Sequence, residues 1–217
     1  MRRWKKRRIN SPVLNLVPKM RNRKQVFRRL CQQAAACIVC PRMTQQKAVL
    51  SAANGSLSAK ILFASEAPGR FGSGRTGIPF HGDRSGDHFE ELIAHIGLTR
   101  QDIFITNAVL CNPLHEGNNS RPTAAEIKNC SSYFKSVLDL VRPKIVVTLG
   151  AVGLTAVNSL CGTRYQLADS VARPITLDDF ILLPLYHPSP RVINWKRSLT
   201  QQKKDFQKIL KLLASLD

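Results

Sequence analysis

The sequence has few acidic side chains, and none at all over its first 65 residues. Lys and Arg outnumber Asp and Glu by 33 to 14, so the formal net charge is +19. Twelve basic residues lie between Met1 and Arg29, whereas the first acidic residue is Glu66. Such a segment attracts a polyanion, because basic side chains displace the counterions condensed on nucleic acid. An Arg-rich organelle transit peptide and a merely solvating tail are the alternatives for this segment.

Long apolar runs are also missing. No stretch approaches the roughly 18 apolar residues of a membrane-spanning helix, and the charged N-terminus lacks the apolar segment of a secretory signal. We therefore expect a soluble, monomeric protein that stays in the cytoplasm, associates with the nucleoid and makes no membrane contact. With 217 residues, 43% of them hydrophobic, the chain can bury one sizeable core. The expected organisation is a basic DNA-binding arm over residues 1–24, disordered until bound, followed by one globular domain over residues 25–217.

Short apolar runs alternate with amphipathic helical patterns after Lys60. Buried strands are expected at residues 61–64, 103–106, 145–149 and 180–185. Helices are expected over residues 26–36, from Asp87 to Gly97, behind Thr123, from Ala151 and over residues 199–213, with a polar surface linker at 44–58. This alternation predicts an α/β fold of three layers, with a central four-stranded parallel sheet flanked by helices. Functional residues should then follow the carboxyl ends of the strands.

Polar residues do follow three of these strands. Glu66 opens a long loop rich in Gly and Arg, where a carboxylate can activate a water or simply cap loop amides. Asn107 follows the second strand, and its amide can read the edge of a base, although Asn is also typical of turns. His187 follows the fourth strand, where it can stabilise an oxyanion or serve a structural role, and Arg191 beyond it can reach a phosphate. The first loop is not a P-loop, because no Lys followed by Ser or Thr opens a helix there.

The six cysteines are unlike a disulfide framework, because a reducing cytosol works against one. Four of them form a close pair and two distant partners, as in an all-cysteine metal site: Cys37, Cys40, Cys111 and Cys130. Zinc and a [4Fe-4S] cluster fit such a set equally well. Cys31 and Cys161 have no such partners and are expected to be ordinary buried thiols.

Several separated motifs, taken in order, resemble one known family. They are Cys37-x-x-Cys40, Glu66-Ala67-Pro68-Gly69, Gly77-Ile78-Pro79-Phe80, Ile105-Thr106-Asn107, Cys111, Cys130, Arg142-Pro143 before a strand ending at Leu149-Gly150, and His187-Pro188-Ser189. Over residues 30–212 the chain resembles the iron-sulfur uracil-DNA glycosylases of families 4 and 5. The resemblance implies the uracil-DNA glycosylase fold, a DNA substrate that is single- or double-stranded, and hydrolysis of the bond between uracil and deoxyribose. It also implies a structural [4Fe-4S] cluster in preference to zinc, held by the four paired cysteines.

The resemblance further implies a role for each motif residue. Glu66 would position or activate the attacking water, and His187 would stabilise the departing anionic base. Phe80 would stack on the extruded uracil, and Asn107 would read its edge. The other residues expected to contact the base are Ala67, Gly69 and Ser189. The residues expected to contact DNA are Arg75, Arg84 and Arg191.

The chain combines features of both families. Glu66-Ala67-Pro68-Gly69 is similar to family 4, whereas Arg75-Thr76-Gly77 and Gly82-Asp83-Arg84-Ser85-Gly86-Asp87 are closer to family 5. This mosaic leaves a second enzymatic reading open, a glycosylase for hypoxanthine, xanthine or mismatched thymine. A reading from another class is a non-catalytic iron-sulfur protein that binds DNA through the same basic surface.

Overall fold

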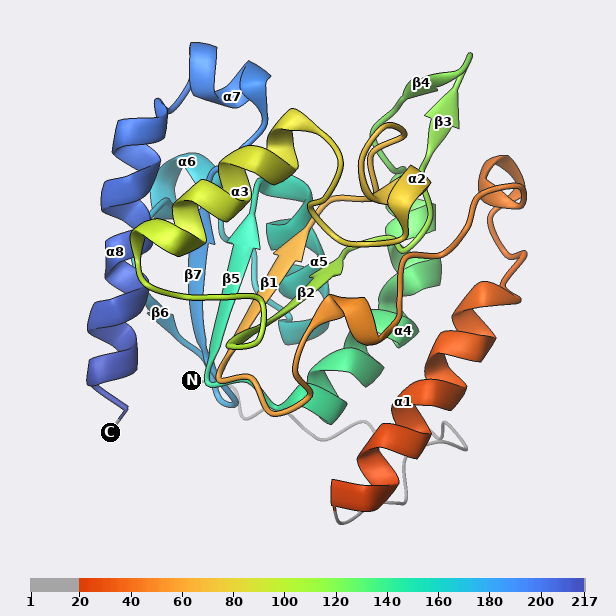
Figure 1. Cartoon of the computed structure of the whole chain (residues 1–217), viewed down its shortest axis with the longest axis horizontal. Helices are drawn as coiled ribbons and strands as arrows, with labels where there is room; N and C mark the ends of the chain where they lie inside the picture. Colours follow the sequence, from red (N-terminus) through yellow and green to blue (C-terminus); the bar gives the residue numbers. More distant parts are fainter. Residues whose placement is uncertain (1–19, 217) are drawn as a thin grey trace.

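The computed structural model describes residues 20–216 (Figure 1). The helices are α1 (Met20–Ala35), α2 (Ser73–Thr76), α3 (Arg84–His95), α4 (Ala124–Val141), α5 (Ala151–Cys161), α6 (Leu167–Ser170), α7 (Pro190–Trp195) and α8 (Leu199–Ala214), with 3-10 turns η1 (Pro41–Met43) and η2 (Ala52–Asn54). The strands are β1 (Ile61–Ser65), β2 (Ile103–Asn107), β3 (Leu114–His115), β4 (Asn118–Asn119), β5 (Ile145–Leu149), β6 (Ile175–Thr176) and β7 (Ile181–Leu185).

The main sheet has the strand order β2-β1-β5-β7-β6. Its first four strands are parallel, which confirms the predicted four-stranded parallel sheet. The short strand β6 adds an antiparallel edge that the sequence did not predict. A separate two-stranded hairpin, β3 and β4, projects from the chain between β2 and α4.

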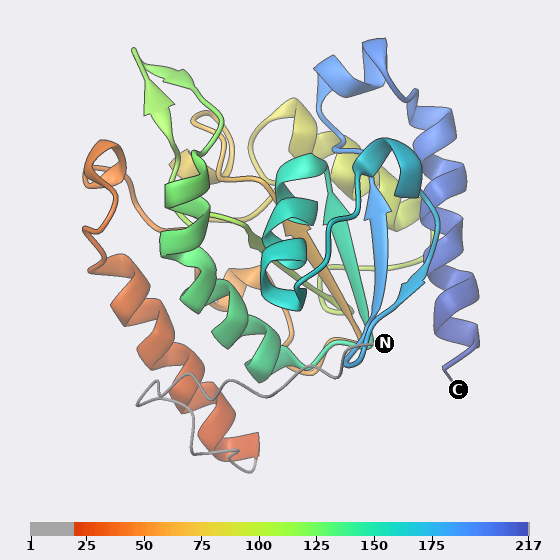
Figure 2. The same cartoon turned by 180° about the vertical axis from the view of Figure 1, so that it is seen from behind.

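Alternate strand residues face opposite layers of helices, because successive side chains of a strand point to opposite faces. On one face, the Phe63 ring packs edge-on against Phe89 of α3 at 5.2 Å and stacks with Phe206 of α8 at 5.9 Å. On the other face, Phe104 packs edge-on against Phe27 of α1 at 5.8 Å. Figures 1 and 2 show α3 and α8 on the first face and α1, α4 and α5 on the second. The predicted three-layer arrangement is therefore confirmed.

Side-chain caps define where two of the helices begin. Thr123 and Glu126 form the reciprocal capping box that the sequence predicted at the start of α4. The expected start of α3 at Asp87 is wrong, because α3 begins at Arg84. Asp83 caps this helix instead, and its carboxylate accepts a hydrogen bond from the Gly86 amide at 2.9 Å.

Residues 44–58 are more than a polar surface linker. Val49 and Leu50 are buried, and so is Asn54. The Asn54 side-chain amide donates to the Ile105 carbonyl at 2.7 Å, which fastens this segment to β2. The segment therefore forms part of the core layer beside the sheet.

Helix α1 begins at Met20, within the segment expected to form the arm. Residues 20–24 are thus helical, and residues 1–19 lie outside the part of the chain that the structure describes. Among residues 20–216, none of the helices is both long and apolar enough to cross a bilayer.

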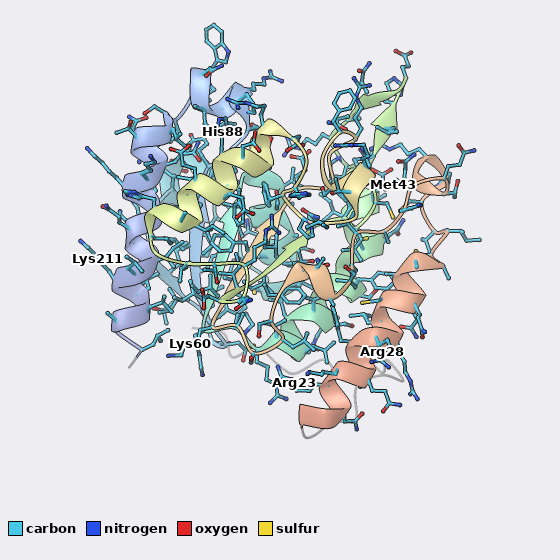
Figure 3. The ribbon with its side chains drawn as sticks, viewed as in Figure 1. Arg23, Arg28, Met43, Lys60, His88 and Lys211 are labelled. Atoms are coloured by element: carbon cyan, nitrogen blue, oxygen red, sulfur yellow. The ribbon has the colours of Figure 1, made fainter. Side chains whose placement is uncertain are left out.

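Arg23 fastens α1 to the carboxyl end of α4 (Figure 3). Its guanidinium donates to the carbonyls of Leu57 at 2.7 Å, of Val141 at 3.2 Å and of Leu140. Helix ends leave carbonyls without partners inside the helix, so a cation at this position satisfies them. The contact fixes the helix that leads into the first two cysteines of the predicted metal site.

Gly153 lets α5 pack directly on β1. A Cβ atom at this position would lie closer to the Ala64 carbonyl oxygen than real Cβ atoms approach. We expect Gly153→Ala to lower the free energy of unfolding by about 1–3 kcal/mol, because this clash outweighs the gain of about 1 kcal/mol in helix propensity. Urea denaturation measures the change.

The matched control is Thr155→Ala on the exposed side of the same helix. This surface change should stay within about 0.5 kcal/mol. An unfolding free energy for Gly153→Ala equal to that of the unchanged protein would contradict the close packing of α5 on β1.

Candidate active site

The carboxyl ends of β1 and β2 bring Glu66 and Asn107 onto one edge of the sheet. Asn107 is the last residue of β2 and pairs in register with Ser65. Backbone bonds continue past the strands, from the Ala108 amide to the Ser65 carbonyl at 2.8 Å and from the Val109 amide to the Glu66 carbonyl at 3.2 Å. Glu66 therefore sits on the strand next to Asn107, at the edge that the sequence predicted.

His187 reaches the same edge from the other side of β1. It lies two residues beyond β7, and the Gly150 amide after β5 donates to the Leu185 carbonyl at 2.8 Å. A Cβ atom at Gly150 would lie 3.4 Å from the Cβ of His187, so glycine leaves room for the histidine. Along the edge, the strand order thus gives Asn107, Glu66, Gly150 and His187.

Phe80 joins this edge from the long loop between β1 and α3. Its ring stacks on Phe89 with centroids 4.4 Å apart and planes 16° apart. The Phe80 ring also lies 5.5 Å from the His187 ring, tilted by 36°. The Phe80 side chain is mostly buried, and its backbone is left-handed with φ 48°. The aromatic ring is therefore held beside the histidine before any ligand binds.

Asp83 is a site residue that the sequence reading missed. Besides capping α3, its second carboxylate oxygen lies against the backbone at Gly69, where an added Cβ would be 3.2 Å away. The negative charge of Asp83 also raises the pKa of His187, so these two side chains interact electrostatically. The pattern Asp87 to Glu90 concealed this cap, because it matches the usual capping sequence better than Asp83 followed by Gly86 does.

Burial sets the charge of His187. It lowers the pKa of this histidine to about 4, and the negative charge of Asp83 opposes the shift only in part. The imidazole is therefore neutral near pH 7, where one ring nitrogen donates a hydrogen bond. The next residue, Pro188, is anchored by its carbonyl, which accepts a hydrogen bond from Nδ1 of His88 at 3.0 Å. Figure 3 shows His88 on α3, beside α7.

Burial acts on Glu66 in the opposite sense. It raises the pKa of the carboxyl group above its ordinary value, while the positive charge of Arg121 opposes the shift. A raised pKa makes a carboxylate a stronger base. The site therefore holds a basic carboxylate and a neutral imidazole on neighbouring parts of one edge.

The other residues expected to contact the base lie on the same loops. Ala67 and Gly69 come one and three residues after Glu66. The Gly69 carbonyl accepts a hydrogen bond from the Gly74 amide at 2.9 Å. Ser189 is the residue before α7, and its carbonyl accepts the first amide bonds of that helix. None of these positions is remote from the edge that carries Glu66 and His187.

The three arginines expected to contact DNA are all exposed. Nε of Arg75 donates to the Phe71 carbonyl at 3.0 Å, so this side chain also braces its own loop. Arg84 opens α3 and makes a loose ion pair with Asp87 at 3.6 Å. Arg191 lies on α7. Exposed cations of this kind can meet phosphates, but they are spread over three elements.

The four cysteines of the predicted metal site come together from three segments. The pKa of Cys111 is raised to about 12, mainly by burial and in smaller part by the nearby thiols of Cys130, Cys37 and Cys40. Burial likewise raises the pKa of Cys130 to about 11, with Cys40 and Cys37 contributing. The four thiols are thus near enough to interact. Within residues 20–216, no three His, Cys, Asp or Glu side chains close around a single metal ion.

An ion pair holds two of these segments together. The Arg42 guanidinium donates to both carboxylate oxygens of Glu126, at 2.6 and 2.7 Å, and to the Arg121 carbonyl at 2.9 Å. The first of these contacts dominates in lowering the pKa of Glu126 to about 2. Asn129, one turn further along α4, donates to the Cys40 sulfur at 3.5 Å. The loop after Cys40 is therefore locked onto the helix that carries Cys130.

Two surface hollows are not lined by Glu66, Phe80, Asn107 or His187. One, of about 370 Å³, is at the amino ends of the strands, beside Lys60 and Leu98. The other, of about 470 Å³, is lined by residues of α7 and by Lys196. The convergence of the candidate residues thus rests on strand register and ring contacts.

The chain matches the family described as the Uracil DNA glycosylase superfamily over residues 52–214. The chain belongs to this superfamily. The α/β fold with a mainly parallel central sheet, predicted from the sequence, is confirmed by the strand pairing of the structure and by this family match.

Named relatives in the superfamily include both types that the motifs suggested. A "Type-4 uracil-DNA glycosylase" of Sulfurisphaera tokodaii is 31% identical over 83% of this chain and 82% of its own length. A "Type-4 uracil-DNA glycosylase" of Thermotoga maritima is 29% identical over 78% of this chain and 85% of its own length. A "Type-5 uracil-DNA glycosylase" of Pyrobaculum aerophilum is 33% identical over 66% and 67%. The expected likeness to families 4 and 5 is confirmed.

Proposed function

We propose that this chain is a uracil-DNA glycosylase that hydrolyses the N-glycosidic bond of uracil in DNA, as the first step of base excision repair. One observation carries the proposal: in a member of this superfamily, Glu66, Phe80, Asn107 and His187 gather at one edge of the sheet. The proposed enzyme is a monofunctional hydrolase. It acts on a single damaged nucleotide and leaves an abasic site.

The target bond is out of reach inside a stacked duplex, so the nucleotide must first be turned out of the helix. Phe80 offers a ring for the extruded base to stack on, because its neighbour Phe89 holds it in place. Asn107 is suited to reading the edge of uracil, since its side-chain amide can both donate and accept. These two residues would select the base, and Ala67, Gly69 and Ser189 would complete the walls.

The reaction replaces a carbon–nitrogen bond with a carbon–oxygen bond. Glu66 orients a water and takes its proton as the oxygen attacks the anomeric carbon of deoxyribose, and the bonding electrons leave with the base. His187 donates a hydrogen bond to the oxygen on which that negative charge collects. The neutral state of His187 near pH 7 supports this role, because a neutral imidazole can donate without itself losing a proton.

The donor set of Cys37, Cys40, Cys111 and Cys130 fits a [4Fe-4S] cluster. Four thiols share one partly buried region, and they do not close around one ion within the described residues. A [4Fe-4S] cluster takes four cysteine thiolates, which is the donor set that these segments supply. When bound, it would supply structural cross-linking of the loop after α1, the loop after β2 and α4.

DNA is the proposed partner. The net charge of +19 supports attraction to phosphates, with Arg75, Arg84 and Arg191 as candidate contacts near the site. We also propose that the basic segment before α1 retains the protein on DNA.

Excision of uracil is the direct test. The purified protein should release free uracil from a uracil-containing oligonucleotide and leave a site that alkali cleaves. His187→Ala should lower the single-turnover rate about 100-fold, because one donor to a developing anion is lost. Glu66→Gln should lower it by about 100-fold or more, because the base that activates water is lost.

Glu91→Gln serves as the control and should keep full activity, because Glu91 is an exposed residue of α3 that pairs with Lys203 of α8. A substrate panel with hypoxanthine, xanthine and mismatched thymine tests the base preference. If one of those bases were released faster than uracil, that base would be the preferred substrate and the proposal of uracil would be wrong. DNA binding without release of any base would instead assign the chain to a non-catalytic class.

The acid side of the pH profile should report Glu66. Activity requires the carboxylate, so the single-turnover rate should fall as pH drops through a pKa that burial has raised. Arg121→Gln removes a positive charge that stabilises the carboxylate, so it should move this acid limb to higher pH. Rates measured at saturating enzyme, from about pH 5 to 9, separate this shift from weaker DNA binding. Arg121→Lys keeps the charge and should leave the limb in place; superimposable profiles for all three proteins would refute the coupling.

The cluster has its own spectroscopic test. Protein purified without oxygen should be brown, with four iron and four sulfide per chain expected for a [4Fe-4S] cluster. Cys37→Ser should lose the colour and unfold more easily, because cluster binding is coupled to folding. Cys161 was expected to be buried, but the structure exposes it, so that prediction is wrong. Cys161→Ser therefore changes a surface thiol and should keep both the colour and the stability. A colourless protein with one zinc per chain would show that the cofactor assignment is wrong.

A further inference from the structure

Helix α7 presents a large aromatic side chain to solvent. Trp195 is 81% exposed, although burying such a ring normally stabilises a protein. It lines the hollow of about 470 Å³ together with Arg191, Val192 and Lys196. An aromatic ring with two cations beside it presents a stacking surface and partners for phosphate groups.

A second exposed ring lies in the loop that follows Glu66. Phe71 is 62% exposed, and the Arg70 guanidinium sits 4.2 Å from its ring centroid. The backbone here is held in place, because the Arg70 amide donates to the Asn119 side chain at 2.9 Å and Arg75 donates to the Phe71 carbonyl. The Phe71 side chain is therefore exposed on a loop whose backbone is held by hydrogen bonds.

The two rings belong to elements on either side of the candidate active site. Helix α7 follows His187 after two residues, and Phe71 follows Glu66 by five. Figures 1 and 2 show α7 and α2 at the same end of the molecule, with the carboxyl ends of β1 and β5 between them. The carbonyl of Pro188, held by His88, fixes the start of α7 relative to α3.

We propose that Trp195 and Phe71 are stacking platforms for unpaired nucleotides on the two sides of the target base, so that the chain prefers single-stranded DNA. The proposal rests on the proposed function, which places the target base between them. Arg191, Lys196 and Arg70 would meet the phosphates of the same strand.

A single strand fits these features better than a duplex does. Bases in a duplex have both faces covered by their neighbours, whereas unpaired bases can stack on aromatic side chains. Exposed rings each flanked by cations, on a chain of net charge +19, also match a polyanion better than an apolar partner.

Tryptophan fluorescence tests the proposal directly. In a Trp4→Phe background, Trp195 is the remaining tryptophan, and its emission should be quenched when an oligonucleotide without uracil binds. Trp195→Ala and Phe71→Ala should each raise the Kd for single-stranded DNA about tenfold at fixed salt. The Kd for duplex of the same sequence should change by less than about twofold, because its bases are not free to stack.

Tyr165→Ala, which removes an exposed aromatic at the far end of α5, should leave both Kd values unchanged. Circular dichroism establishes that each variant is folded. If Trp195 emission were not quenched and Trp195→Ala left the Kd for single-stranded DNA unchanged, the proposal would be overturned. An equal loss of affinity for single-stranded and duplex DNA in the variants would also overturn it. Reduced self-association of Trp195→Ala with unchanged DNA affinity would assign this surface to a second copy and would also overturn it. The binding probe lacks uracil, so quenching does not depend on catalysis. Quenching together with no release of base from a uracil-containing oligonucleotide would refute only the proposed function.

Discussion

The hydrogen-bonded register of four parallel strands is the constraint on which the site depends. Backbone bonds continue one residue past β1 and β5, so the first loop residues inherit the spacing of the strands. Glu66 and Asn107 are neighbours for this reason, although about 40 residues separate them in the chain. The same register sets Gly150 beside His187. A slip of one residue in any strand would turn these side chains to the opposite face.

Burial at this edge perturbs two titratable groups in useful directions. It keeps His187 neutral and makes Glu66 more basic. In each case one nearby charged side chain shifts the pKa in the direction opposite to burial. Asp83 opposes the loss of positive charge on His187, while Arg121 opposes the loss of negative charge on Glu66. The backbone carbonyl of Arg121 also accepts a hydrogen bond from the Arg42 guanidinium, which links the surroundings of the Glu66 carboxylate to the cysteine-bearing loop.

The four parallel strands and most helices followed from the sequence, because each combines a clear period with a recognisable end. The Thr123 capping box and the apolar run before Leu149 are examples. Other features depend on contacts that no local pattern reveals. Asp83 caps α3 through one amide, Val49 and Leu50 are too short an apolar pair to predict burial, and β6 is two residues long. Of the site, the polar residues were predictable from their positions after strands, whereas the orientation of the Phe80 ring required the fold.

That ring sits on a residue with left-handed backbone, a conformation that costs a non-glycine residue about 1–2 kcal/mol. Neighbouring contacts hold it there: the Phe80 carbonyl accepts a hydrogen bond from Arg100, and Gly86 leaves the space that this carbonyl needs. The free-energy cost of orienting the Phe80 ring is therefore met during folding, and an incoming base does not have to offset it. A consequence is that warming should loosen this turn before the sheet beneath it, so affinity for an extruded nucleotide would decline at temperatures where the protein is still folded.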